Sequence, residues 1–417
     1  MKKKVLSVVL SGMMITGLLT GCGSAASTSA SSSAASSAAA STTASAAPAA
    51  ASTSAAASTT AAATATTAAS TAATTTAAAG AASTNVTAEQ LAAVWGDVTK
   101  GPATGKSAAD YTFYGVFGAV NSYSDPYPGS SKSAAQALNI AAPGFDAPTD
   151  WDQTQQNTIL DGLVAKGVKG IYMMTSDPTA GNQEISKLVS AGVNVVCVGG
   201  APNTPSKATL TLATDVYTAS FDGTENLIKA MGGKGGVVGL CGAVTDTNTQ
   251  KRMKAIKDAC AKYPNVKLVQ IIGDIDDTQK ATEAIENILA AKKDQINGFV
   301  STCNSPSIAL ASILSQDEYK DIHAVGTDTD EAVLKGIKSG ALDGTMSQNP
   351  YGQAYLSTIT LKMLADGWTY KKGQDFLIDS GSAYITKDNA DNAQQMQVNK
   401  TMDLAKTWTA RFNAPAK

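Results

Sequence analysis

The sequence contains a single histidine, His323, among 417 residues. A Ser-His-Asp or Cys-His nucleophile needs a histidine as its base, and most catalytic zinc sites use several of them. His323 itself stands at the edge of an apolar run, where we expect a solvated side chain. The sequence therefore offers no set of residues for this chemistry, and we expect no enzyme, no metal centre and no cofactor.

Cysteine and positive charge are also scarce. Of the five cysteines, Cys197, Cys241, Cys260 and Cys303 lie in apolar strand or helix patterns without metal-ligand spacing. We interpret these four as small core residues, with one disulfide among them as the alternative. The formal net charge is −2 and becomes −5 without the three lysines near the N-terminus. This acidic balance argues against nucleic acid as a partner.

The first 22 residues are typical of an export signal. Three lysines precede an apolar run, Val5 to Leu19, that is too short for a membrane span. The run ends in Leu19-Thr20-Gly21-Cys22, which resembles the bacterial lipobox, in which the cysteine is lipidated and becomes the mature N-terminus. The alternative is a secretory signal with an incidental cysteine.

Residues 23–84 contain only Ala, Ser, Thr, Gly and Pro. Without charged, aromatic or large aliphatic side chains, this segment cannot offset the entropy cost of ordering. We expect a disordered tether. A short N-terminal extension follows at 85–110, with an amphipathic stretch from Thr87 to Val98.

From Tyr111 onward, apolar runs of strand length alternate with segments of helical period. This order predicts an α/β fold with parallel sheets that carry helices on both faces. The expected strands are 112–120, 168–174, 193–198, 236–240, 267–272, 298–301, 322–325 and 344–347. The expected helices are 133–139, 155–166, 182–191, 218–231, 250–263, 278–292, 307–314, 331–339 and 352–366.

Two local patterns mimic ligand-binding loops. The glycine cluster Gly232 to Gly239 follows a helix and enters a strand, which is the reverse of a phosphate-binding loop, so we interpret it as a turn that ends the helix. Polar residues before two later helices, Asp276 or Asp277 and Thr329 or Asp330, are expected to be N-caps.

Several segments together resemble the periplasmic-binding-protein family of the ribose-binding type, the solute receptors of bacterial ABC importers. The resemblance covers Tyr111 to Asn389 and is carried by "SDPYPGSSKSAAQAL", "ILDGLVAKGVKGIYMMTSDP", "ATDVYTASFDGTENLIKAM", "NTQKRMKAIKDA", "AVGTDTDEAVLKGIKSGALDGTMSQNP" and "AYITKDNAD".

The resemblance implies two doubly wound lobes joined by three crossover segments, the type I fold of this family. Lobe 1 is expected to comprise 111–213 and 349–375, and lobe 2 to comprise 214–348 and 376–389, with a C-terminal helical tail at 390–417. The crossings are expected near 214–215, 348–349 and 375–380. In this family the solute binds in the cleft between the lobes.

The family's binding positions fall on six residues of this chain. Asp125 and Tyr127 in the first loop are expected to accept sugar hydroxyls and to stack on a sugar ring, unless they form a plain turn. Arg252 is expected to span two adjacent oxygens, unless it is an ordinary surface arginine. The other three are Asp328, which might otherwise cap a helix, Gln348 at the second crossing, and Asn304, with which Ser305 competes.

Two departures from the family pattern bear on the ligand. Ribose receptors carry an Asp-Arg pair where this chain has Gly199-Gly200, and a stacking aromatic near the position of Ile275. Ribose is therefore not the expected ligand. A larger sugar, a sugar derivative or a non-sugar polyol would suit the vacated space.

The resemblance and the N-terminus together imply a lipid-anchored, monomeric solute receptor on the outer face of the bacterial cytoplasmic membrane. Its partners would be a carbohydrate-like solute and an ABC permease. One alternative is a receptor that presents its solute to a membrane sensor kinase or chemoreceptor. A cell-wall enzyme is a further alternative, which glycan turnover by the purified protein would reveal.

Overall fold

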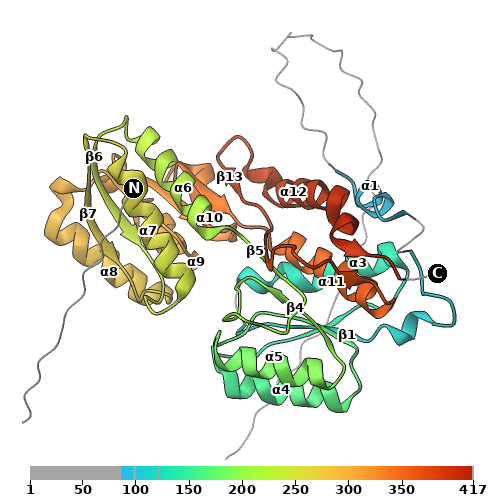
Figure 1. Cartoon of the computed structure of the whole chain (residues 1–417). Helices are drawn as coiled ribbons and strands as arrows, with labels where there is room; N and C mark the ends of the chain where they lie inside the picture. Colours follow the sequence, from blue (N-terminus) through green and yellow to red (C-terminus); the bar gives the residue numbers. More distant parts are fainter. Residues whose placement is uncertain (1–85, 97–99, 121, 416–417) are drawn as a thin grey trace, which may run out of the picture. The chain divides into compact units, whose positions relative to one another are not determined.

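The computed structural model describes residues 86–96, 100–120 and 122–415 (Figure 1). The predicted signal, Cys22 and the predicted tether lie outside the described residues.

Lobe 1 is built on a six-stranded sheet in the order β12-β5-β4-β3-β1-β2. Every neighbouring pair in it is parallel. The strands are short apolar runs, and β3 and β5 are buried along their whole length, as expected for strands covered by helices on both faces. Their bounds are β1 Phe113–Val116, β2 Gly144–Asp146, β3 Gly170–Met173, β4 Asn194–Val198, β5 Thr211–Ala213 and β12 Leu377–Asp379.

Lobe 2 is built on a second six-stranded sheet in the order β13-β10-β9-β8-β6-β7. Its strands are parallel except β13, which runs antiparallel to β10 at the edge. The bounds are β6 Gly235–Leu240, β7 Val266–Ile272, β8 Gly298–Ser301, β9 His323–Thr327, β10 Gly344–Ser347 and β13 Ala383–Ile385. Two parallel sheets wound by helices confirm the predicted α/β fold class.

Helices cover both faces of each sheet (Figure 1). In lobe 1, α3 packs on α11 and α4 on α5; in lobe 2, α6 packs on α7, and α9 contacts both α8 and α10. Aspartates cap five of these helices, including Asp277 and Asp330, the caps predicted from the sequence. The bounds are α3 Pro126–Leu138, α4 Gln153–Ala165, α5 Ala180–Ser190, α6 Val216–Ala230, α7 Thr247–Ala261, α8 Thr278–Lys292, α9 Asn304–Ile313, α10 Glu331–Ser339 and α11 Pro350–Ala365.

The chain passes between the sheets after β5, after β10 and after β12. We expected residues from 376 onward to belong to lobe 2, but β12 pairs with β5 in the lobe 1 sheet, with Leu377 opposite Thr211. The third passage therefore lies between Asp379 and Ala383. A strand of three residues carries too little periodicity to be recognised before its pairing is known.

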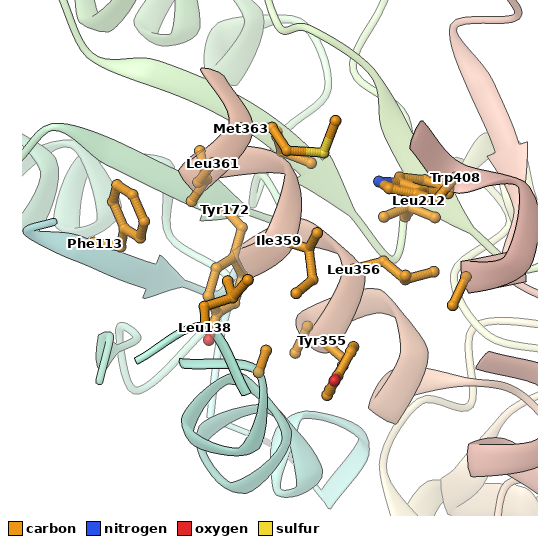
Figure 2. Packing of buried hydrophobic residues seen from close by; sticks show 14 of the residues in the cluster. Phe113, Leu138, Tyr172, Leu212, Tyr355, Leu356, Ile359, Leu361, Met363 and Trp408 are labelled. Carbon is orange, nitrogen blue, oxygen red and sulfur yellow. The ribbon is translucent and has the colours of Figure 1, made fainter. Parts of the chain in front are cut away.

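Helix α11 forms the centre of the lobe 1 core. Figure 2 shows Leu356, Ile359 and Met363 of this helix among Leu138, Leu212 and Trp408, which come from α3, β5 and the C-terminal helix. Each fully buried side chain of this kind contributes roughly 1.5 to 3 kcal/mol. This helix is buried on nearly every side and has no solvent stripe. Its buried threonines satisfy their hydroxyls within the helix, where Thr358 donates to the Ala354 carbonyl and Thr360 to the Leu356 carbonyl.

The N- and C-terminal segments pack on this core. The short helix α1 (Ala88–Ala93) contacts α3, and Trp95 donates from its indole nitrogen to the Tyr355 hydroxyl at 3.3 Å. The tail forms α12 (Ala393–Trp408), and β14 (Phe412–Asn413) pairs with β11 (Thr369–Tyr370). Ala393 belongs to the lobe 2 core and Trp408 to the lobe 1 core, so α12 joins the two lobes.

Candidate functional site

Two polar residues follow neighbouring strands of lobe 2. Asp328 comes directly after β9 and Gln348 directly after β10, and because these strands are parallel, both residues lie at the same edge of the sheet. The Gln348 amide nitrogen Nε2 donates to Asp328 Oδ1 at 2.8 Å. The structure thus brings together two of the six predicted site residues.

The backbone of Asp328 is held in an unusual conformation. Its φ is +72°, in the left-handed region that few non-glycine residues adopt. The Asp328 amide donates to the Met346 carbonyl at 2.9 Å, and its carbonyl accepts from the Thr345 hydroxyl at 2.8 Å. Neighbours on β10 therefore fix the direction in which this carboxylate points.

Burial raises the pKa of Asp328, while the Gln348 hydrogen bond and the positive charge of Arg252 oppose that rise. Within the part of the chain that the structure describes, no group donates a hydrogen bond to the second carboxylate oxygen, Oδ2. A desolvated carboxylate with one oxygen still available is a strong acceptor for hydroxyl donors.

Arg252 reaches the same edge from α7. Together with Gln348, Thr302 and Thr327 it lines a cavity of about 10 Å³, which is room for about one water molecule. Arg252 forms no ion pair within 4 Å with any described carboxylate, so its planar fork of donors is not committed to a protein acceptor. This arrangement supports a binding role over that of an ordinary surface arginine.

Asn304 is the first residue of α9, a helix that begins three residues earlier than the predicted Ser307. It follows β8, the neighbour of β9, and therefore also lies at this edge of the lobe 2 sheet. The competing residue, Ser305, donates its hydroxyl to the Asp276 carbonyl at 2.6 Å. Ser305 is thus part of the scaffold in this structure.

The first loop of lobe 1 differs from the expected arrangement. Asp125 is exposed just before α3 and does not cap that helix with its side chain. Tyr127 is 0% exposed, packs on Phe117 and Tyr172, and donates its hydroxyl to Gln353. The Tyr127 ring is therefore a core group in this structure and has no free face for a ligand.

Tyr123, which was not predicted, is a second aromatic side chain of the first loop. It is half-buried, its ring centroid is 6.0 Å from that of Phe117, and its hydroxyl is 3.1 Å from Gln353 Oε1. Burial raises the pKa of Tyr123, with a further rise from Asp328 and a smaller opposing effect from Arg252. Charges of lobe 2 therefore act on an aromatic side chain of lobe 1.

Gly199 and Gly200 do not simply leave empty space. A Cβ at Gly199, whose φ is +71°, would lie 2.7 Å from Met174 Sδ, so the methionine occupies that side. A Cβ at Gly200 would lie 3.7 Å from the side-chain nitrogen of Asn248, on α7 of lobe 2. Ile275, the second departure, is 5% exposed and belongs to the lobe 2 core.

A larger pocket of about 200 Å³ lies where the chain passes between the lobes. Asp379 on the lobe 1 side accepts from the Asp215 amide at 2.8 Å, and Asp215 caps α6. From lobe 2, Asn248 and Lys251 line the same pocket. Neither residue was predicted, because the resemblance pointed only to Arg252 on this helix.

Metal binding and membrane spanning find no support among the described residues. These residues contain no cluster of three or more His, Cys, Asp or Glu side chains that would hold a metal ion, and none of their helices is both long and apolar enough to cross a bilayer. His323 is half-exposed with its Nδ1 3.0 Å from Asp343 Oδ1. Cys197, Cys241, Cys260 and Cys303 are free thiols.

Comparison with known proteins agrees with this geometry. A xylitol-binding protein from Mycolicibacterium smegmatis is 25% identical over 242 residues, which cover 58% of this chain and 68% of that protein. A D-apiose import binding protein from Paraburkholderia graminis is 24% identical over 266 residues, 62% of this chain and 84% of its own length.

Solved structures show the same fold. An ABC transporter solute-binding protein from Burkholderia graminis, crystallised with D-arabinose, superposes with a TM-score of 0.62 at 24% identity, covering 68% of this chain and 98% of that one. The family model described as periplasmic binding protein domain matches residues 119–369. That match spans more than half of the sequence, and the chain belongs to the periplasmic binding protein family.

Proposed function

We propose that this protein is an extracytoplasmic receptor that captures a sugar or sugar-like solute between its lobes and delivers it to an ABC importer. One observation carries the proposal. The Asp328 carboxylate, the Gln348 amide and the Arg252 guanidinium gather at one edge of lobe 2. On the same helix as Arg252, the Asn248 side-chain nitrogen lies 3.7 Å from where a Cβ of Gly200 in lobe 1 would stand, so this edge faces lobe 1.

The chemistry of this set suits a polyhydroxylated, uncharged ligand. Asp328 accepts hydroxyl protons, Arg252 donates to adjacent oxygens, and Gln348 and Asn304 each offer a donor and an acceptor. We propose that Asp125, exposed just before α3, joins them from lobe 1. The names of the relatives, binders of xylitol and apiose, fit the same class of ligand.

Ribose is not the proposed ligand. Gly199 and Gly200 offer no charged side chain, and the nearby Met174 makes that wall of lobe 1 apolar. A ligand with an apolar edge toward Met174 and hydroxyls toward Asp328 suits both walls.

The N-terminal sequence completes the proposal. Lipidation at Cys22 would hold the mature protein at the outer face of the cytoplasmic membrane, and the 23–84 tether would let the lobes move and dock as a monomer on a permease. A relative named as an import binding protein supports import over signalling.

A thermal-shift screen tests the binding proposal. The purified soluble chain is melted with pentoses, hexoses, disaccharides and polyols in turn, and with amino acids as the matched negative set. A ligand at 100 times its dissociation constant should stabilise the protein by about 2.7 kcal/mol. Stabilisation by amino acids and by no carbohydrate would contradict the proposal.

A further inference from the structure

Exposed apolar side chains are rare in the described part of the chain and are not scattered. The large ones are Val120, Trp151 and Leu377, which are 67%, 53% and 43% exposed. Leu377 lines the pocket between the lobes. Val120 and Trp151 follow β1 and β2, two neighbouring parallel strands, so both lie at the carboxyl edge of the lobe 1 sheet, where ligands of such sheets bind.

The position of β2 in the sheet places Trp151 within this edge. The sheet runs from β12 and β5, which lead directly into the crossings, to β2 at the opposite end. Trp151 therefore lies at the end of the edge that is farthest from the crossings. We refer to this end of the edge as the mouth, and the pocket lined by Asp379 and Asp215 lies at the opposite end, beside the crossings.

The indole ring of Trp151 rests on backbone. A Cβ added to Gly118 would lie 2.1 Å from Trp151 Cζ3, so the ring covers a position that only glycine can occupy. The ring centroid is 6.3 Å from that of Phe117, which in turn is 6.0 Å from Tyr123. Trp151 thus extends the aromatic cluster of Phe117 and Tyr123 toward the exposed end of the sheet edge.

The loops beneath the ring are held in place. The buried Gln156 side chain donates from Nε2 to the carbonyls of Phe117 and Met174, each at 2.8 Å. The Ser176 hydroxyl donates to the Gly118 carbonyl at 2.8 Å. Asp152, the residue after Trp151, caps α4. A rigid support keeps the exposed ring in one orientation before any ligand arrives.

The exposed Trp151 ring is available for polar and stacking contacts with a ligand. Among the described residues, no acceptor takes a hydrogen bond from its indole nitrogen and no cation stands over its face. An open indole face with a free N–H at its edge suits a flat C–H surface flanked by hydroxyls. A cyclic sugar presents such a surface, whereas an open-chain polyol does not keep one.

We propose that Trp151 stacks on the C–H face of a cyclic sugar at the mouth of the cleft and selects ring-form sugars over open-chain polyols. This inference rests on the proposed function, because it assigns a wall to the same binding site. The position of Trp151 after the second strand, not in the first loop where Tyr127 was expected to stack, is what the structure adds.

Fluorescence tests the placement of Trp151 directly. The other three tryptophans, Trp95, Trp368 and Trp408, are 2%, 9% and 0% exposed. A bound sugar should therefore change the emission and reduce the acrylamide quenching of Trp151 alone. Trp151→Phe should abolish this response, and the matched control Trp368→Phe should keep it.

Calorimetry tests the selectivity. With a pentopyranose or hexopyranose that binds the wild type, Trp151→Ala should weaken binding about 10-fold and Trp151→Phe about 3-fold, with the alditol of the same sugar changed less than 3-fold. Unchanged sugar affinity in Trp151→Ala, in a protein whose melting temperature is unaltered, overturns the inference and leaves the proposed function standing. If the wild type binds no carbohydrate at all, both are overturned.

Discussion

Replacing Asp328 by asparagine removes one negative charge from the candidate site with little change of shape. Asparagine tolerates the left-handed backbone that this position requires, with φ of +72°, whereas alanine would be strained there. The new side chain can still accept the Gln348 hydrogen bond. Any change in binding then reports on the charge and not on the fold.

The expected loss of affinity follows from the hydrogen bonds involved. A hydrogen bond to a charged group contributes about 1.5 to 3 kcal/mol and a neutral one about 0.5 to 1.5 kcal/mol. Because Gln348 keeps Oδ1 as its acceptor, the amide nitrogen Nδ2 of Asp328→Asn replaces Oδ2. A ligand hydroxyl that donated to Oδ2 must turn round and accept from this neutral amide, which loses about 1 to 1.5 kcal/mol. This corresponds to about 10-fold weaker binding of the sugar.

The same change should not destabilise the ligand-free protein. Burial raises the pKa of Asp328 above its ordinary value of 3.8, so between 3.8 and the raised value the folded state binds more protons than the unfolded state. The free energy of unfolding then falls as pH rises through this window. Asp328→Asn removes that fall, so its melting temperature at pH 7 should equal or exceed that of the wild type.

Calorimetric titration with the sugar and ligand-free melts at acidic and neutral pH measure both effects. Asp330→Ala is the matched control, because Asp330 caps α10 through the Ala332 amide at 2.8 Å. Losing that cap should lower stability by about 1 kcal/mol and leave affinity unchanged. A lowered melt with unchanged affinity in Asp328→Asn would refute the reasoning and make Asp328 a scaffold residue.

Three further changes have defined outcomes. Gly236→Ala places a Cβ 1.8 Å from the Gln295 carbonyl oxygen and should lower stability by about 1 to 3 kcal/mol in denaturant titration. The control Gly162→Ala, on an open helix surface, should not lower it, and equal stability of the two variants would contradict close packing at Gly236. Asp366→Asn leaves the buried Lys362 ammonium without its ion-pair partner and should cost about 3 to 5 kcal/mol in the same titration. Stability equal to that of the wild type would contradict this role of the pair. Cys22→Ser should abolish detergent-phase partitioning of the processed protein, and unchanged partitioning would count against lipidation.

Much of the fold is predictable because helix caps and apolar periodicity in the sequence agree with the packing of the folded chain. The predicted bounds of α8 and α10 match the structure, since an aspartate cap precedes each amphipathic run. The bounds of β8 and β10 also match. In contrast, β2 and β5 were missed, as each has three residues and exists through pairing with neighbours distant in sequence.

The candidate site is less predictable because a short loop decides which aromatic ring faces the cleft. The resemblance pointed to Tyr127, whose position next to Pro126 fits the family pattern, but α3 begins at Pro126 and turns that ring into the core. Tyr123, in contrast, stays half-buried. No periodicity distinguishes two tyrosines four residues apart when one belongs to a helix and the other to the turn before it.

The lobe 2 residues were selected through the family resemblance, and the sheet explains why they meet. Asp328 and Gln348 each follow a strand directly, and the edge of a parallel sheet brings such residues together whatever the loops do. Trp151 lies five residues beyond the end of the short, unrecognised β2, so the sequence offered no strand from which to place it. A site built on strand ends can therefore be read from a sequence, whereas a wall built on loops depends on contacts such as Trp151 on Gly118 that only the folded chain reveals.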